Sequence, residues 1–328
     1  MKFILVSLAL LSVIYFNSCG GDQDIILPSV TGKAGEVLVV MDKASWNSEK
    51  GDYFRKLFLR DYPALPQSEP VFEPINIPSS GFDNIFKTHR NVIIVQIGSH
   101  IPESKVVAQH DVWAETQLLV TIAATTEEEY DKLLEERGES IVAFIEDAER
   151  DRLIDNYKKF TEQNIFKKIN DKYHIALNIP KGYTLDTDSA DFAWVAHETP
   201  MISQGIFIYS YPYRDTSTFT IDYLIRKRDK FLKKYVPGAI DGSYMITARE
   251  FPPEFREFTL NGKYVAEVRG LWEVENDYMG GPFISLSTVD EKRGRVVTVE
   301  GFVYAPKYDK RNYLRQVEAI LYTLKILE

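Results

Sequence analysis

From about residue 164 onward, the chain is dominated by short segments in which β-branched or aromatic residues alternate with other residues. Such alternation, with turn residues between the segments, is typical of antiparallel strands that bury one face. Two further segments, 220–235 and 313–327, repeat apolar residues with the period of an amphipathic helix. The second half of the chain therefore predicts an antiparallel sheet covered by two helices. The alternating segments are YHIALNIP, FAWVAHET, QGIFIYSYPY, KYVAEVRGLWEV, FISLSTVD and RVVTVEGFVYAP.

The first half has a different pattern of apolar residues. Continuous apolar runs at 37–41 and 92–97 indicate strands buried on both faces. Two more strands are expected at 106–112 and 117–123, next to helical segments. The segment LPQSEPVFEPINIP contains four prolines, so it suits only an edge strand or extended chain. These features predict an α/β half with a mixed sheet, which makes the whole chain an α+β protein.

Helices in the first half are expected from their capping residues and apolar spacing. Ser48 precedes a predicted helix over 52–62, and Thr126 precedes a short one. A separate long helix is expected over 139–161. The pattern of apolar residues changes from helical to alternating near Asn164, where we expect a domain boundary. The predicted organisation is a signal peptide over 1–18, a lipidated tether over 19–34, an N-terminal α/β domain over 35–163 and a C-terminal α+β domain over 164–328.

The chain opens with MKFILVSLALLSVIYFNSCGG, a positive charge followed by a short apolar run and small polar residues. The run is too short to cross a bilayer, which takes about 20 apolar residues, and it is typical of a secretory signal. Its end at Cys19, the only cysteine, resembles a bacterial lipoprotein signal. That resemblance implies a diacylglycerol thioether on Cys19, palmitate-type acylation and anchoring to a membrane of the cell envelope, in particular the outer membrane. Which side of that membrane the protein faces stays open.

Composition narrows the classes of function further. Apolar residues make up 45% and charged residues 27%, which is typical of a globular protein. The net charge of −9 argues against non-specific nucleic-acid binding, which depends on Lys and Arg. With Cys19 acylated no thiol remains, so disulfides, thiolate metal sites and cysteine catalysis are excluded.

Sequence motifs of catalysis are absent. No G-x-G, P-loop, G-x-S-x-G or H-E-x-x-H pattern occurs, and His89, His100 and His110 are too scattered to indicate a metal site. The sequence therefore predicts no catalytic residue, no metal and no cofactor, and it favours a non-enzymatic role without excluding an enzyme.

Several residues are candidates for a ligand or partner surface. Asp42 follows the strand at 37–41, near Trp46, and either lines a pocket or caps the next helix. Tyr209, Tyr211 and Tyr213 share one face of IFIYSYPYR and form either a binding platform or the packing surface under a helix.

Two other features carry alternatives of the same kind. Gly280 and Gly281 enter a strand and suit either a tight turn or a loop close to a ligand. The segment RKRDKFLKK concentrates six cations on one predicted helix, either to contact an anionic membrane or partner or as a solvated face.

Taken together, several segments resemble an uncharacterised family of Bacteroidota-type envelope lipoproteins, a domain of unknown function without an established activity. These segments are the lipobox cysteine, GEVLVVMD, LPQSEPVFEP, HRNVIIVQIG, DVWAETQ and NDYMGGPF. Separately, the order of strands and helices in the second half resembles the layout of the PsbP and Mog1 fold, by analogy only.

Three functions remain after these exclusions. The first is a non-enzymatic binding or assembly factor that contacts an envelope protein. The second is an envelope hydrolase with Asp42, Asp52 or Glu69 as acid and base, two carboxyls about 5–10 Å apart in a cleft. The third is a solute-binding module with an apolar pocket, expected between the two halves.

Overall fold

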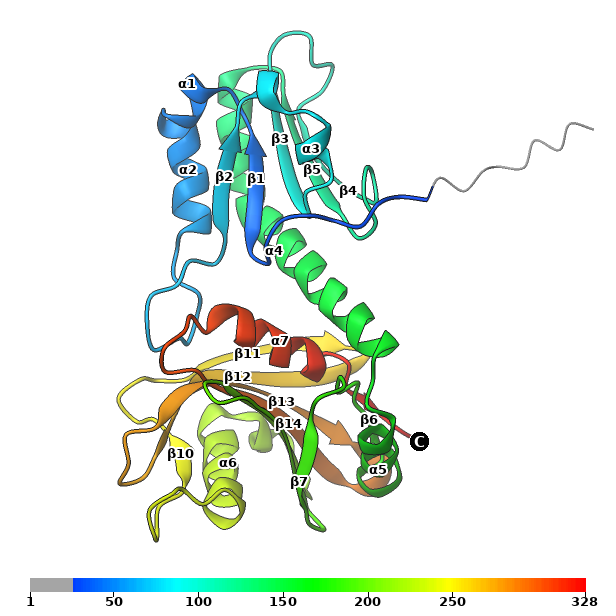
Figure 1. The fold of residues 1–328 in the computed structure, drawn as a ribbon, viewed down its shortest axis with the longest axis vertical. Helices are drawn as coiled ribbons and strands as arrows, with labels where there is room; N and C mark the ends of the chain where they lie inside the picture. Colours follow the sequence, from blue (N-terminus) through cyan, green and yellow to red (C-terminus); the bar gives the residue numbers. More distant parts are fainter. Residues whose placement is uncertain (1–25) are drawn as a thin grey trace, which may run out of the picture.

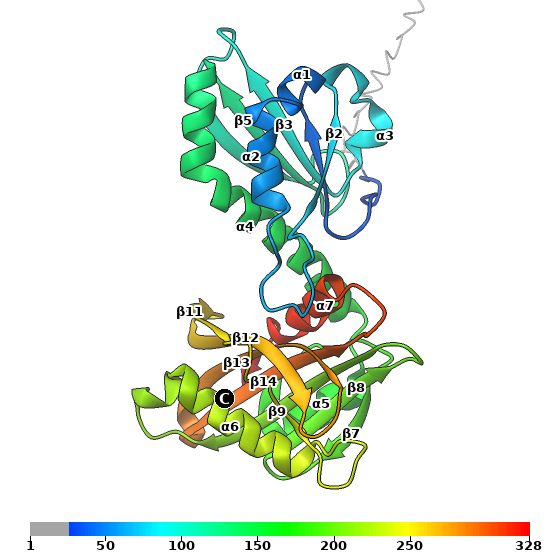
Figure 2. The same cartoon turned by 90° about the vertical axis from the view of Figure 1, so that its left-hand side faces the viewer.

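The computed structural model describes residues 26–328, which form two large separate sheets and a small two-stranded one (Figures 1 and 2). The α+β prediction, with a mixed N-terminal sheet and an antiparallel C-terminal one, is confirmed. Cys19, the signal peptide and the first part of the predicted tether, residues 19–25, lie outside the described residues.

The first sheet has the order β2-β1-β3-β5-β4, parallel except for β4. Its apolar strands are buried on both faces, as their sequences predict, and the proline-rich segment supplies the edge strand β2. One face packs on α2 and α4 and the other on α3 and a loop. The strands are β1 Glu36–Val40, β2 Glu73–Ile77, β3 Asn91–Ile97, β4 Lys105–His110 and β5 Leu118–Ala124, and the helices are α1 Lys43–Trp46, α2 Glu49–Phe58, α3 Asn84–Lys87 and α4 Glu127–Lys159.

The second sheet is antiparallel, with the order β10-β12-β13-β14-β9-β8-β7 and β11 paired to β12. The strands are β7 Thr184–Asp188, β8 Phe192–Glu198, β9 Ser203–Pro212, β10 Met245–Thr247, β11 Glu254–Leu260, β12 Lys263–Val274, β13 Gly280–Asp290 and β14 Arg295–Tyr304. The helices are α5 Gln163–Tyr173, α6 Ile221–Tyr235 and α7 Arg311–Leu321, and β6 Ile175–Ala176 pairs with β15 Lys325–Ile326. Short 3₁₀ turns occur at Ser79–Gly81, Thr216–Phe219 and Glu291–Arg293.

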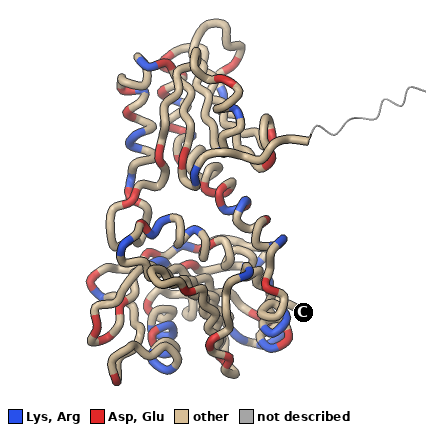
Figure 3. The backbone as a smooth tube through the Cα atoms, viewed as in Figure 1, with Lys and Arg blue, Asp and Glu red and all other residues tan. Residues whose placement is uncertain are grey.

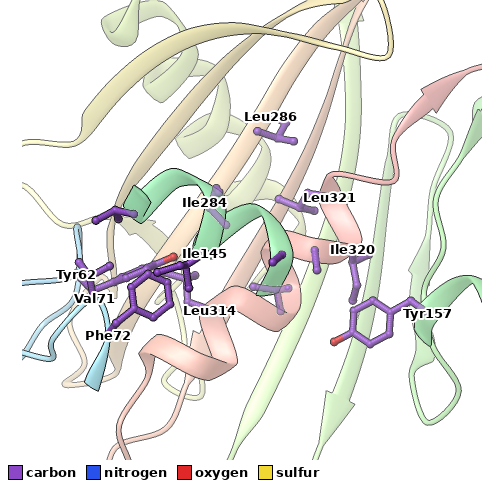
Figure 4. Packing of buried hydrophobic residues seen from close by; sticks show 14 of the residues in the cluster. Tyr62, Val71, Phe72, Ile145, Tyr157, Ile284, Leu286, Leu314, Ile320 and Leu321 are labelled. Atoms are coloured by element: carbon purple, nitrogen blue, oxygen red, sulfur yellow. The ribbon is translucent and has the colours of Figure 1, made fainter. Parts of the chain in front are cut away.

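Successive side chains along each strand of the second sheet point to opposite faces, and each face packs against a different helix. Ile206 and Ile208 pack in the same core as α7, whereas Phe207 and Tyr209 pack in the core under α6. Helix α7 also contacts the other half of the molecule, because Leu314 packs with Ile145 of α4 and with the loop before β2 (Figure 4). One hydrophobic core therefore extends from β1 to β14.

Four expectations about helices are wrong in detail. The helix after Thr126 and the one over 139–161 are a single helix, α4, which runs from the first sheet to the second (Figure 1). Gly138 within it does not break the helix but leaves room for the Tyr53 hydroxyl of α2, where a Cβ would clash. Helix α2 spans Glu49–Phe58 and ends before the predicted 62, although Ser48 caps it as expected.

The other two differences are in the second half. Helix α5 lies where alternating chain was expected to begin, and its Ile165, Ile169 and Tyr173 follow a helical spacing that the sequence shows. Helix α7 stops at Leu321, because the chain turns at Tyr322 and Thr323 and continues into β15.

Candidate functional site

An apolar pocket of about 570 Å³ opens on the face of the second sheet that α6 covers only in part. Helix α6 ends at Tyr235, and residues 236–239 after it form one side of the pocket. Strands β8, β12 and β14 with the loops around them, together with the first residues of β9 and β10, provide the rest. The apolar lining consists of Trp194, Pro200, Met201, Ile202, Val236, Pro237, Ala239, Met245, Trp272, Val274, Met279, Phe302, Tyr304 and Pro306, with Glu198, Thr199, Ser203, Gly238 and Lys307 among them.

Three aromatic side chains from different strands form the centre of this lining. The ring of Phe302 on β14 lies 6.4 Å from that of Trp194 on β8 and 5.7 Å from that of Trp272 on β12. Gly205 of β9 pairs with Phe302, and a Cβ there would overlap the phenyl ring. The missing side chain lets this ring lie flat against the sheet, so the pocket has an aromatic floor.

The predicted glycine pair does not line the pocket but lies beside Trp272, which does. Gly280 and Gly281 begin β13 and pair with Glu273 and Trp272, so they belong to a strand, not to a turn or a loop. A Cβ on Gly281 would lie 3.1 Å from the Trp272 indole nitrogen and closer still to the Val303 carbonyl. Gly281 therefore gives the Trp272 ring its place in the lining.

The predicted row of tyrosines lies under α6. Tyr209 and Tyr211 are buried, with their rings 4.8 Å and 6.3 Å from that of Phe231 in the helix. Tyr213 is half-buried near Phe219. Burial raises the pKa of the Tyr211 hydroxyl well above its usual range. The tyrosines thus contribute to the core at the covered end of the face whose open end is the pocket.

Asp42 and Trp46 lie at the carboxyl end of β1, in the first half. The Asp42 carboxylate caps α1 by accepting a 2.9 Å bond from the Ser45 amide, and hydrogen bonds from Ser45 lower its pKa. Trp46 lies 5.0 Å beneath the Arg55 guanidinium, which also donates to the Trp46 carbonyl. These residues order the β1–α2 connection and do not line the apolar pocket.

The other two proposed carboxylates also have structural partners. Asp52 forms an ion pair with Arg55, three residues along α2. Glu69 is buried and caps α7 of the second half, accepting bonds from the amides of Lys310 at 2.6 Å and Arg311 at 2.8 Å. Asp42, Asp52 and Glu69 therefore hold three different elements and do not face one another as an acid and base.

The cavity at the junction of the two halves is small and charged, in contrast to the apolar one expected there. It has a volume of about 200 Å³, and α4, with both signs of charge, lies on one side of it (Figure 3). Glu318 of α7 accepts from Arg269 at 2.8 Å and from the Tyr62 hydroxyl at 3.1 Å. Glu267 pairs with Arg269 and with Arg256. These bonds tie the loop before β2 to α7 and β12.

The titration behaviour of this cavity follows from its ion pairs. Burial alone would raise the pKa of Glu318, but the charges of Arg269 and Arg150 and a hydrogen bond from Arg269 lower it to about 2. Burial raises the pKa of Glu146 on α4, and Glu318 adds to this effect. Both oxygens of Glu318 are engaged in hydrogen bonds, so its carboxylate serves the junction and not an incoming substrate.

The basic helix α6 divides its cations between two faces. Arg228 is buried and bonds Glu300 of β14 through Nε at 3.0 Å and Thr247 through Nη1 at 2.8 Å. The other cations lie on the outer side, where Lys227 and Lys233 approach tyrosine rings. They are Arg226, Lys227, Lys230, Lys233 and Lys234.

Sequence reasoning missed the residues that form the pocket. Trp194, Trp272 and Phe302 each stand in a segment predicted to be a strand, but 30 or more residues separate any two of them. Nothing local indicates that they meet. The one available signal was that the strands of the second half contain more aromatic residues than a single helix can cover, which indicates that some of them stay accessible to a ligand.

Among residues 26–328, no helix is both long and apolar enough to span a membrane. The same part of the chain holds no group of three His, Cys, Asp or Glu side chains placed to bind a metal ion.

Among the solved structures that are similar to about half of this chain are those of two proteins, Mog1p and LpqN. Saccharomyces cerevisiae Ran-binding protein Mog1p is 9% identical over 47% of this chain and 91% of its own, with a TM-score of 0.32. LpqN of Mycobacterium tuberculosis, described as involved in cell envelope biogenesis, is 14% identical over 47% and 83%, with a TM-score of 0.31. At these values the likeness assigns no function.

No curated protein matches the chain. Family models match it in two parts, instead of one family covering the whole. Residues 30–158 match a domain of unknown function designated DUF8532. Residues 162–323 match a second domain of unknown function, designated DUF4837, so the resemblance to uncharacterised families holds for both parts of the chain.

Proposed function

We propose that this protein is a non-enzymatic binding protein of the cell envelope, which takes the apolar part of a ligand into the pocket beside α6. The observation that supports this most is the pocket itself, whose lining is apolar over most of its residues. Its volume of about 570 Å³ lies within the range of roughly 300–1,000 Å³ that is usual for ligand pockets.

The physical basis is uncovered apolar surface next to a covered core. The aromatic residues under α6 are packed by the helix, whereas Trp194 and Tyr304 beyond its end remain half-buried. A ligand that covered them would gain roughly 25 cal/mol for each Å² removed from water. Three methionines in the lining, which have flexible and polarisable side chains, suit a surface that adapts to its ligand.

The three carboxylates proposed for an envelope hydrolase all have structural partners. Asp42 and Glu69 cap helices and Asp52 pairs with Arg55, so none of them is free to act on a substrate in a shared cleft. Binding without chemistry is the function that the remaining features support.

Membrane attachment is part of the proposal and rests on the resemblance of the first residues to a lipoprotein signal. Cys19 would carry the lipid and hold the folded part near the membrane. Cells expressing the natural protein should incorporate labelled palmitate into it, and Cys19→Ala should abolish the labelling. Labelling that persists in the variant would remove the anchor from the proposal.

The pocket can be tested with N-phenyl-1-naphthylamine, an uncharged apolar fluorophore. Ala239→Trp fills the pocket from an exposed loop position and should lower the affinity at least tenfold. Ala108→Trp, at an exposed position of β4, introduces the same side chain far from the pocket and should leave the affinity unchanged. No saturable binding to the natural protein, or equal loss in both variants, would contradict the proposed function.

A second matched pair tests the polarity of the lining. Met201 and Val107 are both 36% exposed, but only Met201 lines the pocket. Met201→Glu should weaken fluorophore binding by placing a charge in an apolar site, and Val107→Glu should not.

A further inference from the structure

We propose that the rim of the apolar pocket docks a partner protein through an apolar segment flanked by Lys or Arg. This inference rests on the proposed function and adds the chemistry of the partner. It is drawn from the loops that surround the pocket mouth, at 198–203, 237–244, 274–280 and 304–309, which we call the rim loops.

Each rim loop combines a residue that lines the pocket with a large apolar or aromatic side chain in contact with solvent. Met201 does both in the first loop, and Ile240, next to Ala239, is 52% exposed. Tyr278, next to Met279, is fully exposed, and Tyr308, next to Lys307, is 45% exposed. Apolar side chains at the tips of several loops around one pocket are typical of an interaction surface.

The charge of the rim loops selects among the partners that such a surface could bind. The loops contain Glu198, Asp241, Glu275, Asp277 and Asp309, against one cation, Lys307. The difference, one positive against five negative charges, is −4. Among residues 26–328, none of these six side chains takes part in an ion pair, since all the ion pairs lie elsewhere. The rim loops therefore contain more acidic than basic groups, and none of these acidic groups forms an ion pair within the described residues.

Cations on the neighbouring helix do not cancel this charge. Lys233 of α6 lies 4.8 Å from the ring of Tyr244, at the end of the second rim loop, and adds one positive charge at the edge. Lys234 is already paired with Asp191. Lys310, directly after the fourth rim loop, donates to the Tyr308 carbonyl at 3.0 Å and adds a second positive charge beside Asp309. With Lys233 and Lys310 included, the net charge around the pocket mouth falls from −4 to −2, so the surface stays acidic.

An acidic, apolar rim favours a basic, apolar partner. Complementary charge raises the association rate and selects the partner, and the pocket supplies the apolar contact that gives the complex its lifetime. An anionic bilayer would be repelled by the same groups, so the rim is not suited to lie on the membrane surface. The partner that fits is a protein segment with large apolar side chains between Lys or Arg residues.

Three chemical probes test the inference. The peptide KKLWLLKK represents the proposed partner, EELWLLEE has the same apolar centre with the opposite charge, and phosphatidylglycerol vesicles represent an anionic membrane. We expect the lysine peptide to bind at least tenfold more tightly than the glutamate peptide at low salt, with the difference decreasing as salt is added. Residues 19–328 carrying Cys19→Ser, which lack lipid, should not bind the vesicles.

Charge-reversal variants test whether the acidic residues of the rim loops cause the preference for the lysine peptide. The double variant Asp241→Lys and Glu275→Lys should remove the preference for the lysine peptide. Asp131→Lys with Glu135→Lys changes the net charge equally on the exposed side of α4 and should retain it.

The outcomes separate the two proposals. If N-phenyl-1-naphthylamine binds but the two peptides bind equally, or if the vesicles bind through the rim, the basic partner is wrong and the pocket stands. If neither the fluorophore nor any peptide binds, the proposed function fails as well.

Discussion

Arg228 shows how one residue in a run of cations acquires a different role from its neighbours. It lies in the basic segment of α6 but is 1% exposed, under the helix, against the fully buried Glu300. Its guanidinium also lies 3.7 Å from the centre of the Phe283 ring. The helical spacing already places Arg228 in the apolar row with Leu224 and Phe231, so its burial, though not its partner, could be predicted.

Removing this cation should be costly. Arg228→Met leaves the Glu300 carboxylate buried without its partner, and we expect a loss of about 3–5 kcal/mol in the free energy of unfolding. Replacing both residues, Arg228→Met with Glu300→Leu, should cost clearly less, because no buried charge is left unpaired. Urea denaturation of the two variants measures the difference. If both variants lost the same free energy of unfolding, the contributions of Arg228 and Glu300 to stability would not be coupled.

Glu318 predicts how acid acts on the junction. Its pKa in the folded protein is about 2, below the ordinary 4.5, so the folded state binds its proton less readily than the unfolded one. The resulting stability is present above about pH 4.5 and is lost as the pH falls toward 2. Glu318→Gln should be less stable than the natural protein at pH 7 and should lose less stability between pH 4.5 and pH 2. Parallel acid-dependent slopes in urea denaturation would contradict this assignment.

At the scale of elements, strand identity was easier to predict than helix limits. The apolar run of β1 and the alternation of β9 contain their burial pattern within a few residues. Gly138 in the middle of α4 makes room for Tyr53 of another helix, and the chain after α7 pairs with β6 through β15. Contacts between distant residues decide such limits, so a local pattern cannot provide them.

Helix α7 depends in the same way on a distant residue. Glu69 accepts from the first amides of the helix, and its negative charge also favours the helix dipole. Glu69→Ala should lower the free energy of unfolding by about 1–2 kcal/mol, whereas Asp309→Ala, an exposed neighbour, should have little effect. Thermal or urea unfolding measures the stability of both variants. If Glu69→Ala and Asp309→Ala destabilised the protein equally, Glu69 would not act as a helix cap.

At the scale of the whole molecule, α4 and α7 join the two halves. Arg311 and Arg315 of α7 donate to the carbonyls of Pro70 and Val71 in the loop before β2, and one hydrophobic core includes residues of both sheets. The predicted boundary near residue 164 remains a prediction about folding units. The pocket was beyond sequence reasoning, because its rings come from strands β8, β12 and β14 and only the folded sheet brings them together.

The shared core predicts that the halves unfold together. Circular dichroism of secondary structure and near-ultraviolet signals of the aromatic residues should report one coincident thermal transition. Two separate transitions would mean that the junction contributes less than its buried contacts indicate.

Intrinsic fluorescence tests the binding pocket most directly. Of the four tryptophans, Trp194 and Trp272 line the pocket, and Trp46 and Trp113 lie in the first half. In a Trp46→Phe, Trp113→Phe variant, an uncharged brominated naphthalene should quench the remaining fluorescence saturably. Ala239→Phe fills the pocket without adding a third tryptophan. Added to this variant, it should abolish the saturable component of the quenching. Quenching that stays linear with concentration, or that Ala239→Phe does not change, would contradict a ligand site in this pocket.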